Sequence, residues 1–170
     1  MSEQIFQTIA CGAARGAITH PANFGLAAAH AEAARQHAAA ADAHALAAEM
    51  HFEAFVPDED FDPDAQQDAV TASADAAIQT NTAAEANELV GGVLSALRDA
   101  EREANEASRQ AEDGEDSRDA HAAAAKHHAA LATLHAIAAA SVALGSEEAE
   151  EARAEAESAT IRAADAVAAR

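Results

Sequence analysis

Histidine recurs at intervals of seven residues in two separate parts of this alanine-rich chain. The two sets are His30, His37, His44 and His51, and then His121, His128 and His135. Seven residues are nearly two turns of an α-helix, so each set forms one stripe along a single helix face. Alanine stands three positions after each histidine of the first set, and charged residues occupy the far side of the same helix. The pattern predicts two helices that direct their histidines into a packed seam.

The two histidine segments also match each other. Ala29–Met50 and Ala120–Ser141 are identical at 13 of 22 positions without a gap, three histidines included. Frequent alanine raises such a score, but it does not explain three coinciding histidines. Each segment is followed by a turn and by another alanine-seamed stretch. We therefore expect an all-α protein, an antiparallel helical bundle built from a duplicated helical hairpin.

Prolines, glycines and capping residues divide the chain. Asn23 can cap the first long helix, which must stop before Pro57, and Gly145 is suited to end the helix that carries the second histidine set. Gly91-Gly92 interrupts a continuous stretch of alternating three- and four-residue spacings that runs from 65 to 111. The expected organisation is an N-terminal arm, 1–23, and a helical bundle, 24–170, made of a first hairpin (24–55 and 64–90), a connecting helix (93–112) and a second hairpin (116–144 and 147–170).

Two sets of residues are candidates for contacts between helices or between proteins. Ile5 and Phe6 form a short apolar segment in the arm, which we expect to be a docking element. The seam residues that we expect to pack are Ala33, Ala40, Ala47, Val90, Val93, Leu97, Leu131 and Ala138. Alanine seams allow close helix contacts, and alanine has the highest helix propensity.

Composition limits the core and the partners. Alanine accounts for 57 residues, whereas leucine contributes 8 and tryptophan and tyrosine are absent, so little apolar area is available for burial. The net charge is −20, with 30 acidic residues against 10 Lys and Arg. A phosphate backbone needs clustered basic residues, so nucleic acid is excluded as an expected partner. Salt would screen the self-repulsion, and we expect a halophilic source, with a GC-rich mesophilic bacterium as the alternative.

Other recognisable signals are weak. Cys11 is the single cysteine, so one chain cannot form a disulfide framework or a thiolate metal site. The chain has no signal-peptide pattern at its start and no apolar stretch long enough to span a membrane. We expect a cytoplasmic protein, or a virion component, that does not bind membranes. Motifs for nucleophilic or acid–base catalysis are absent, so we expect no enzyme activity and no cofactor.

The acidic linker between the first two helices has two interpretations. Asp58, Asp60, Asp62 and Asp64 alternate as the oxygen ligands of a calcium loop do. Pro63 stands where such a loop needs glycine, and Ala69 where it needs glutamate. We therefore expect a solvated acidic turn, and weak cation binding remains the alternative.

The histidine stripes allow three interpretations. In the first, imidazoles fill the gap between alanine seams and hydrogen-bond to a carbonyl or carboxylate across the helix interface. In the second, the stripes on two facing helices bind a transition metal through His30, His37, His44, His51, His121, His128 and His135. Ligands seven residues apart on one helix are about 10 Å apart, which is too far to share an ion. A pH switch is the third interpretation.

Residues 24–55 and 116–144, with alanine-rich helices and histidine every seven positions, resemble small accessory proteins from the structural gene clusters of tailed phages and haloarchaeal tailed viruses. The resemblance implies a virion or head-assembly component with no catalytic residues. We therefore expect a non-enzymatic structural or assembly protein that forms a homo-oligomer or binds a larger particle through its seams and arm. A histidine-stripe metal-binding bundle is the alternative function.

Overall fold

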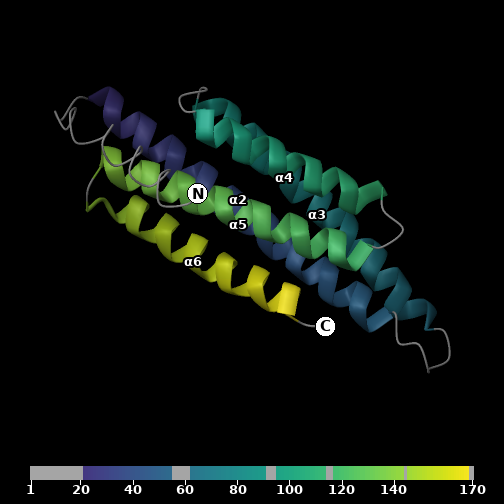
Figure 1. Cartoon of the computed structure of the whole chain (residues 1–170). Coiled ribbons are helices and arrows are strands. Elements are labelled where there is room, and N and C mark those ends of the chain that lie inside the picture. The colour runs from purple at the N-terminus through teal and green to yellow at the C-terminus, as the bar shows by residue number, and fades with distance from the viewer. Residues whose placement is uncertain (1–20, 55–61, 91–94, 114–116, 144, 169–170) are drawn as a thin grey trace.

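A computed structural model describes residues 21–54, 62–90, 95–113, 117–143 and 145–168. These residues form five helices and no strands: α2 (Pro21–Ala54), α3 (Pro63–Val90), α4 (Ser95–Asp113), α5 (Ser117–Val142) and α6 (Glu147–Ala168). Consecutive helices run in opposite directions along a common axis (Figure 1). The predicted all-α bundle is therefore confirmed. The proposed docking residues Ile5 and Phe6 and the seam residue Val93 lie outside the described residues.

Local sequence signals explain where the helices begin and end. α2 begins at Pro21, earlier than Asn23, and proline suits a first helical position because that position needs no N–H donor. At the start of α3, Asp62 Oδ1 accepts hydrogen bonds from the backbone N–H groups of Asp64 (2.9 Å) and Ala65 (3.3 Å). The last aspartate of the acidic linker before Pro63 is thus a helix cap.

The turn between α5 and α6 has the predicted chemistry. Gly145 has a φ of +74°, a backbone conformation that glycine adopts without steric cost. Ser146 follows it, and its hydroxyl oxygen accepts a hydrogen bond from the Ala149 N–H at 3.3 Å. The two residues therefore stop one helix and cap the next.

The long alternating stretch 65–111 forms two helices. α3 ends at Val90, directly before Gly91-Gly92, and α4 begins at Ser95. Figure 1 shows that the two helices run antiparallel, so the chain reverses between them. The expected connecting helix is α4, and it packs against α5.

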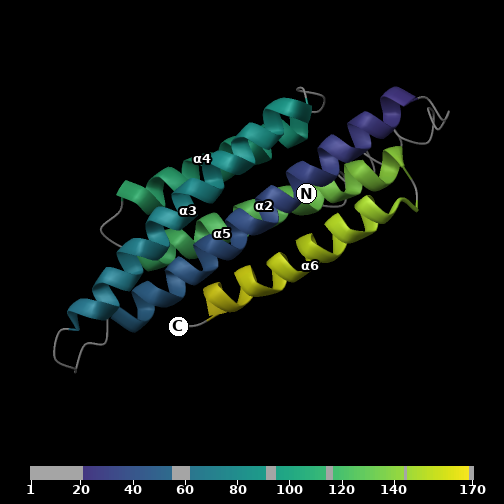
Figure 2. The same cartoon turned by 180° about the vertical axis from the view of Figure 1, so that it is seen from behind.

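α2 and α5 are the central antiparallel pair, and the other helices cover its two sides. α3 packs on α2 and α4 packs on α5, whereas α6 contacts both central helices. In both views α3 and α4 lie on one side of the central pair and α6 lies on the other (Figures 1 and 2). The two histidine helices, α2 and α5, thus have equivalent positions at the centre of the bundle. The helices that follow them, α3 and α6, do not have equivalent positions, because α3 packs on one central helix and α6 packs on both.

The side covered by α6 has a core made entirely of alanine. Its fifteen buried residues come from α2, α5 and α6: Ala31, Ala34, Ala38, Ala41, Ala45, Ala125, Ala129, Ala132, Ala136, Ala139, Ala149, Ala152, Ala156, Ala159 and Ala163. A methyl group buries little area, so this core depends on many short contacts between closely spaced helices. It has no spare volume for a larger side chain.

Replacement of Ala159 by leucine tests this close packing. Ala159 is fully buried, and added methylene groups in a tightly packed core cost about 1–3 kcal/mol of unfolding free energy. The matched control is Ala154→Leu on the exposed face of α6, which we expect to change stability by less than about 0.5 kcal/mol. Urea unfolding of both variants in the same molar salt measures the difference. Equal free energies of unfolding for Ala159→Leu and Ala154→Leu would contradict the close packing of α6.

Candidate functional site: a buried histidine ladder

The seven heptad histidines form one continuous stack between α2 and α5, which we call the histidine ladder. Rings from the two helices alternate along it in the order His30, His135, His37, His128, His44, His121 and His51. Neighbouring ring centroids are 5.1–5.7 Å apart. Because the helices are antiparallel, each ring of one helix fits between two rings of the other. The seven-residue spacing thus becomes a regular interleaved stack.

The ladder is almost entirely excluded from solvent. His44, His121 and His128 have no exposed surface, and the other internal rings are at most 3% exposed. Only His51, at one end of the ladder, is half-buried. The prediction that these histidines lie on a packed seam is therefore confirmed.

Three pairs of rings face each other through their Nδ1 atoms. The Nδ1–Nδ1 distances are 3.1 Å for His30–His135, 3.0 Å for His37–His128 and 2.8 Å for His44–His121. Such a contact is a hydrogen bond only when one Nδ1 carries a proton and the other presents its lone pair. Each pair therefore combines one Nδ1–H ring with one Nε2–H ring.

Two hydroxyl groups from the covering helices join the middle of the ladder. Ser108 of α4 lies 2.9 Å from His128 Nε2 and 3.1 Å from His44 Nε2. Thr80 of α3 lies 3.1 Å from His44 Nε2 and 3.3 Å from the Ser108 hydroxyl. Each of the four helices α2, α3, α4 and α5 contributes one polar group to this cluster. The predicted carbonyl or carboxylate partners are wrong, because imidazoles and hydroxyls fill those places.

The hydrogen-bond geometry also determines one tautomer directly. The Ser73 hydroxyl donates to the Ala69 carbonyl oxygen at 2.9 Å, so it has no proton left for another partner. His51 Nε2 lies 2.9 Å from the same hydroxyl oxygen. His51 must therefore donate from Nε2 when it is neutral, and its Nδ1 then carries the lone pair.

Four buried polar atoms near the ladder have no hydrogen-bond partner among the described residues. They are Nε2 of His37, Nε2 of His121 and both amide atoms of Asn87. The Asn87 side chain acts on the pKa of His37, yet it makes no hydrogen bond of normal geometry. Such unpaired groups are uncommon in a protein interior, and here two of them mark the ends of the hydrogen-bonded part of the ladder.

Burial keeps the rings of the ladder neutral. It lowers the pKa of His37 and of His121 to about 4, and that of His44 and of His135 to about 3. Burial also lowers the pKa of His128, and the neighbouring imidazoles lower it further. An imidazolium here would lose its hydration and face other rings that compete for the same proton. At neutral pH the ladder is therefore uncharged.

The other predicted seam residues are buried wherever they are described. Ala33, Ala40, Ala47, Val90, Leu97, Leu131 and Ala138 are each at most 7% exposed. His127, next to His128, lies outside the ladder and has its Nδ1 3.7 Å from a carboxylate oxygen of Glu103. Sequence reasoning missed Thr80, Ser108 and Ser73, because a hydroxyl within an alanine seam has no spacing signal of its own.

In the described part of the chain, no three His, Cys, Asp or Glu side chains converge on one point as metal ligands would. The ladder offers nitrogen atoms in pairs instead. A metal bound to it would therefore have to accept two imidazole ligands, or take further ligands from other molecules.

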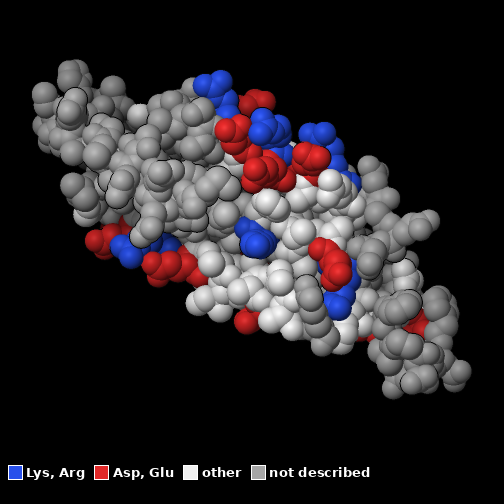
Figure 3. Space-filling view, viewed as in Figure 1, with Lys and Arg blue, Asp and Glu red and all other residues white. Residues whose placement is uncertain are grey.

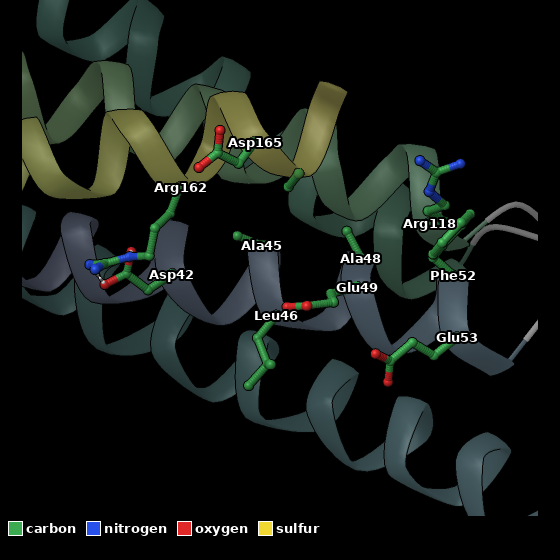
Figure 4. A pocket seen from close by; sticks show the side chains of 11 residues that line it. Asp42, Ala45, Leu46, Ala48, Glu49, Phe52, Glu53, Arg118, Arg162 and Asp165 are labelled. Carbon is green, nitrogen blue, oxygen red and sulfur yellow. Dashed lines mark hydrogen bonds and ion pairs between the residues drawn. The ribbon is translucent and has the colours of Figure 1, made fainter. Parts of the chain in front are cut away.

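A separate concave surface lies where α2, α5 and α6 meet. Arg162 of α6 forms a two-point ion pair with Asp42 of α2, and the guanidinium of Arg118 lies 4.7 Å above the ring of Phe52 (Figure 4). Both arginines are already paired with groups of their own chain. These contacts fix α6 and α5 against α2 at this end of the bundle.

Comparison with protein families, curated proteins and solved structures finds no match for this chain. The class of protein that the fold and the site define is an all-α helical bundle with a buried histidine ladder. None of the described helices is long and apolar enough to cross a membrane.

Acid should unfold this protein cooperatively because of the ladder. Unfolded histidine titrates near pH 6.5, whereas burial lowers the pKa of the folded rings to about 3 or 4. Below pH 6.5 the unfolded state binds more protons, so stability is highest above that pH and falls as the pH drops toward 4. Each such ring lowers the free energy of unfolding by about 1.4 kcal/mol for every pH unit between 6.5 and its folded pKa.

Proton uptake on unfolding measures this effect. At pH 5.5 we expect unfolding to take up several protons per chain, and the double variant His37→Leu, His128→Leu to take up fewer. His127→Leu, outside the ladder, is the control and should match the parent. Uptake by the double variant equal to that of the parent would contradict the neutral ladder.

Proposed function

We propose that this chain is a non-enzymatic structural or assembly protein that associates with further copies of itself. One observation carries this proposal: an open groove between α4, α5 and α6 with only two charged lining residues, on the surface of a chain with a net charge of −20. Six of the seven ladder histidines are buried inside, so they are not accessible to a partner.

Small apolar side chains line the groove. Its volume is about 660 Å³, and its lining residues are Ala100, Glu103, Lys126, Ala129, Ala130, Thr133, Leu134, Thr160, Ala163, Ala164 and Val167. Val167 is 37% exposed. Nine of the eleven side chains carry no charge. A groove of this kind buries apolar area when a helix of another molecule enters it.

The distribution of charge favours a second copy as the occupant. In Figure 3 charged side chains gather along the outer edges of α4 and α6, and the part of the surface between them that is not drawn in grey is mostly uncharged. Two copies that each carry −20 repel one another least where this surface meets its equivalent. The two charged residues of the lining, Glu103 and Lys126, have opposite signs, so they can pair across a two-fold axis.

Other properties of the chain agree with this role. Large apolar side chains are exposed elsewhere on the bundle, among them Ile78 at 59% and Ile161 at 63%. The acidic composition suits a solution of high salt, where screening permits like-charged copies to approach. The resemblance to accessory proteins of tailed viruses points to a virion or head-associated component of a halophilic source, and this finer assignment is part of the proposal.

Sedimentation of the full chain in molar potassium chloride tests self-association. We expect an oligomer in the parent protein and a shift toward monomer in Ala130→Glu, which adds a negative charge to the groove. Ala74→Glu, on the exposed face of α3, is the matched control and should sediment as the parent does. A monomeric parent at all concentrations, or equal dissociation by both variants, would refute the groove as the interface.

A second function, transition-metal binding, is favoured by the three Nδ1 pairs. Two nitrogens bound to one zinc ion at about 2.0–2.1 Å lie roughly 3.3 Å apart in a tetrahedral site. The ladder holds its pairs at 2.8–3.1 Å, so each pair needs only a small opening. Seven-residue spacing is too wide for chelation within one helix, and the antiparallel pairing supplies the second ligand from the other helix.

Calorimetric titration of zinc, nickel and copper(I) into the full chain tests metal binding. The titration is made at pH 7.5 in a chloride-free molar potassium salt, and the double variant His37→Leu, His128→Leu is the comparison. Micromolar binding that is reduced in the variant would support a metal-binding function. No micromolar binding by the parent would remove it.

A further inference from the structure

The middle of the histidine ladder contains a continuous chain of hydrogen bonds, in which Ser108 also lies 3.1 Å from His44 Nε2 and Thr80 3.5 Å from His128 Nε2. It passes from His121 to His44, through the Thr80 and Ser108 hydroxyls, to His128 and then to His37. The successive donor–acceptor distances are 2.8, 3.1, 3.3, 2.9 and 3.0 Å. His44 and His128 each use both ring nitrogens, whereas the terminal rings, His121 and His37, each use Nδ1 alone.

The two hydroxyl groups are free to take part in this chain. Thr71, Ser73, Thr82, Thr133 and Thr160 each donate to a carbonyl oxygen of their own helix. Thr80 and Ser108 instead contact one another and the Nε2 atoms of the ladder. Their protons are therefore available to the rings.

Counting protons leaves two arrangements in which all five hydrogen bonds are made and both hydroxyl protons are used. In one, His121 donates from Nδ1 to His44, which donates from Nε2 to Thr80. Thr80 donates to Ser108, which donates to His128 Nε2, and His128 donates from Nδ1 to His37. In the other, every donor and acceptor is exchanged. Any different set of tautomers either loses one of the five hydrogen bonds or leaves a buried hydroxyl proton without an acceptor, which disfavours it by about fivefold.

We propose that these four imidazoles and two hydroxyls form a proton relay through the bundle. A proton that binds Nε2 of His121 moves the Nδ1 proton of His121 to His44. Each following group passes on its own proton in turn, and His37 releases one from Nε2. One proton enters and one leaves, the charge inside is unchanged afterwards, and the chain is left in its second arrangement.

The unpaired atoms lie where such a relay needs them. Nε2 of His37 and Nε2 of His121 have no partner among the described residues, and these are the two terminal nitrogens of the chain. The Asn87 amide beside His37 is also without a partner. At the other end, the half-buried His51 stacks on His121 at 5.5 Å. The interior of the chain is fully paired, and its two terminal nitrogens are buried and have no partner among the described residues.

The relay does not depend on self-association, and it competes with metal binding. A metal held between His44 Nδ1 and His121 Nδ1 would occupy the place of the proton that joins them. The relay is therefore a property of the metal-free protein, and it is tested in the presence of a chelator.

Nitrogen-15 NMR of the imidazoles in the full chain at pH 7.5 tests the tautomers. We expect His37 and His44 of α2 to share one tautomer, and His121 and His128 of α5 to share the opposite one. We also expect couplings across the Nδ1–Nδ1 hydrogen bonds. The same tautomer in all four rings, or two different tautomers on one helix, would overturn the proposal without any variant.

The rate at which each ring changes between its two tautomers tests the relay itself. In the parent, all four rings should change tautomer at one common rate, because each passage of a proton exchanges donor and acceptor in every ring. In the double variant Thr80→Val, Ser108→Ala the link between the two pairs is removed, and the pairs should change tautomer at separate rates. Ser73→Ala affects only the contact to His51 and should keep the common rate. Separate rates in the parent, or a common rate in a folded double variant, would overturn the relay.

Discussion

The contact between opposed Nδ1 atoms holds the two central helices of this bundle in register. Alanine seams pack closely, but a row of methyl groups distinguishes one axial position from the next only weakly. A hydrogen bond between two buried rings is directional, and a misplaced ring would leave polar atoms unpaired in the interior. The three pairs, at 2.8–3.1 Å, therefore supply the specificity that methyl contacts lack. A single buried polar residue has the same effect in coiled coils.

The histidine ladder alone does not determine the axial register of α5 against α2, because more than one register pairs the rings. If α5 moved by one heptad along α2, His37 would face His135, His44 would face His128 and His51 would face His121, so three pairs would again form. These rings already stack at 5.5–5.7 Å. The hydroxyls of α3 and α4 distinguish the two registers, because Thr80 and Ser108 meet the ladder at one height. The histidine pairs therefore restrict α2 and α5 to a few registers, and the hydroxyls of α3 and α4 select one of them.

The two sides of the central helix pair have different physical roles. On the α6 side, alanine methyls alone form the contacts, and the described interior there contains no side chain larger than alanine. On the other side, rings and hydroxyls form a polar interior that burial keeps uncharged. Tight methyl packing places the helices close enough for the rings to meet, and the rings fix their relative position. On the surface of this chain with a net charge of −20, one groove is nearly uncharged.

The sequence by itself determined the helices, their main boundaries and the burial of the histidines, because seven-residue spacing, proline, glycine and alanine content act through local geometry. The buried alanines of α6 and the turn at Gly145-Ser146 were predictable for the same reason. Only the tertiary structure decided which atoms the rings meet. Antiparallel pairing joins His30 to His135 across 105 positions of the chain, and Thr80 and Ser108 reach the ladder from separate helices. Such contacts depend on the rotation and axial position of packed helices, which no periodicity within one helix specifies.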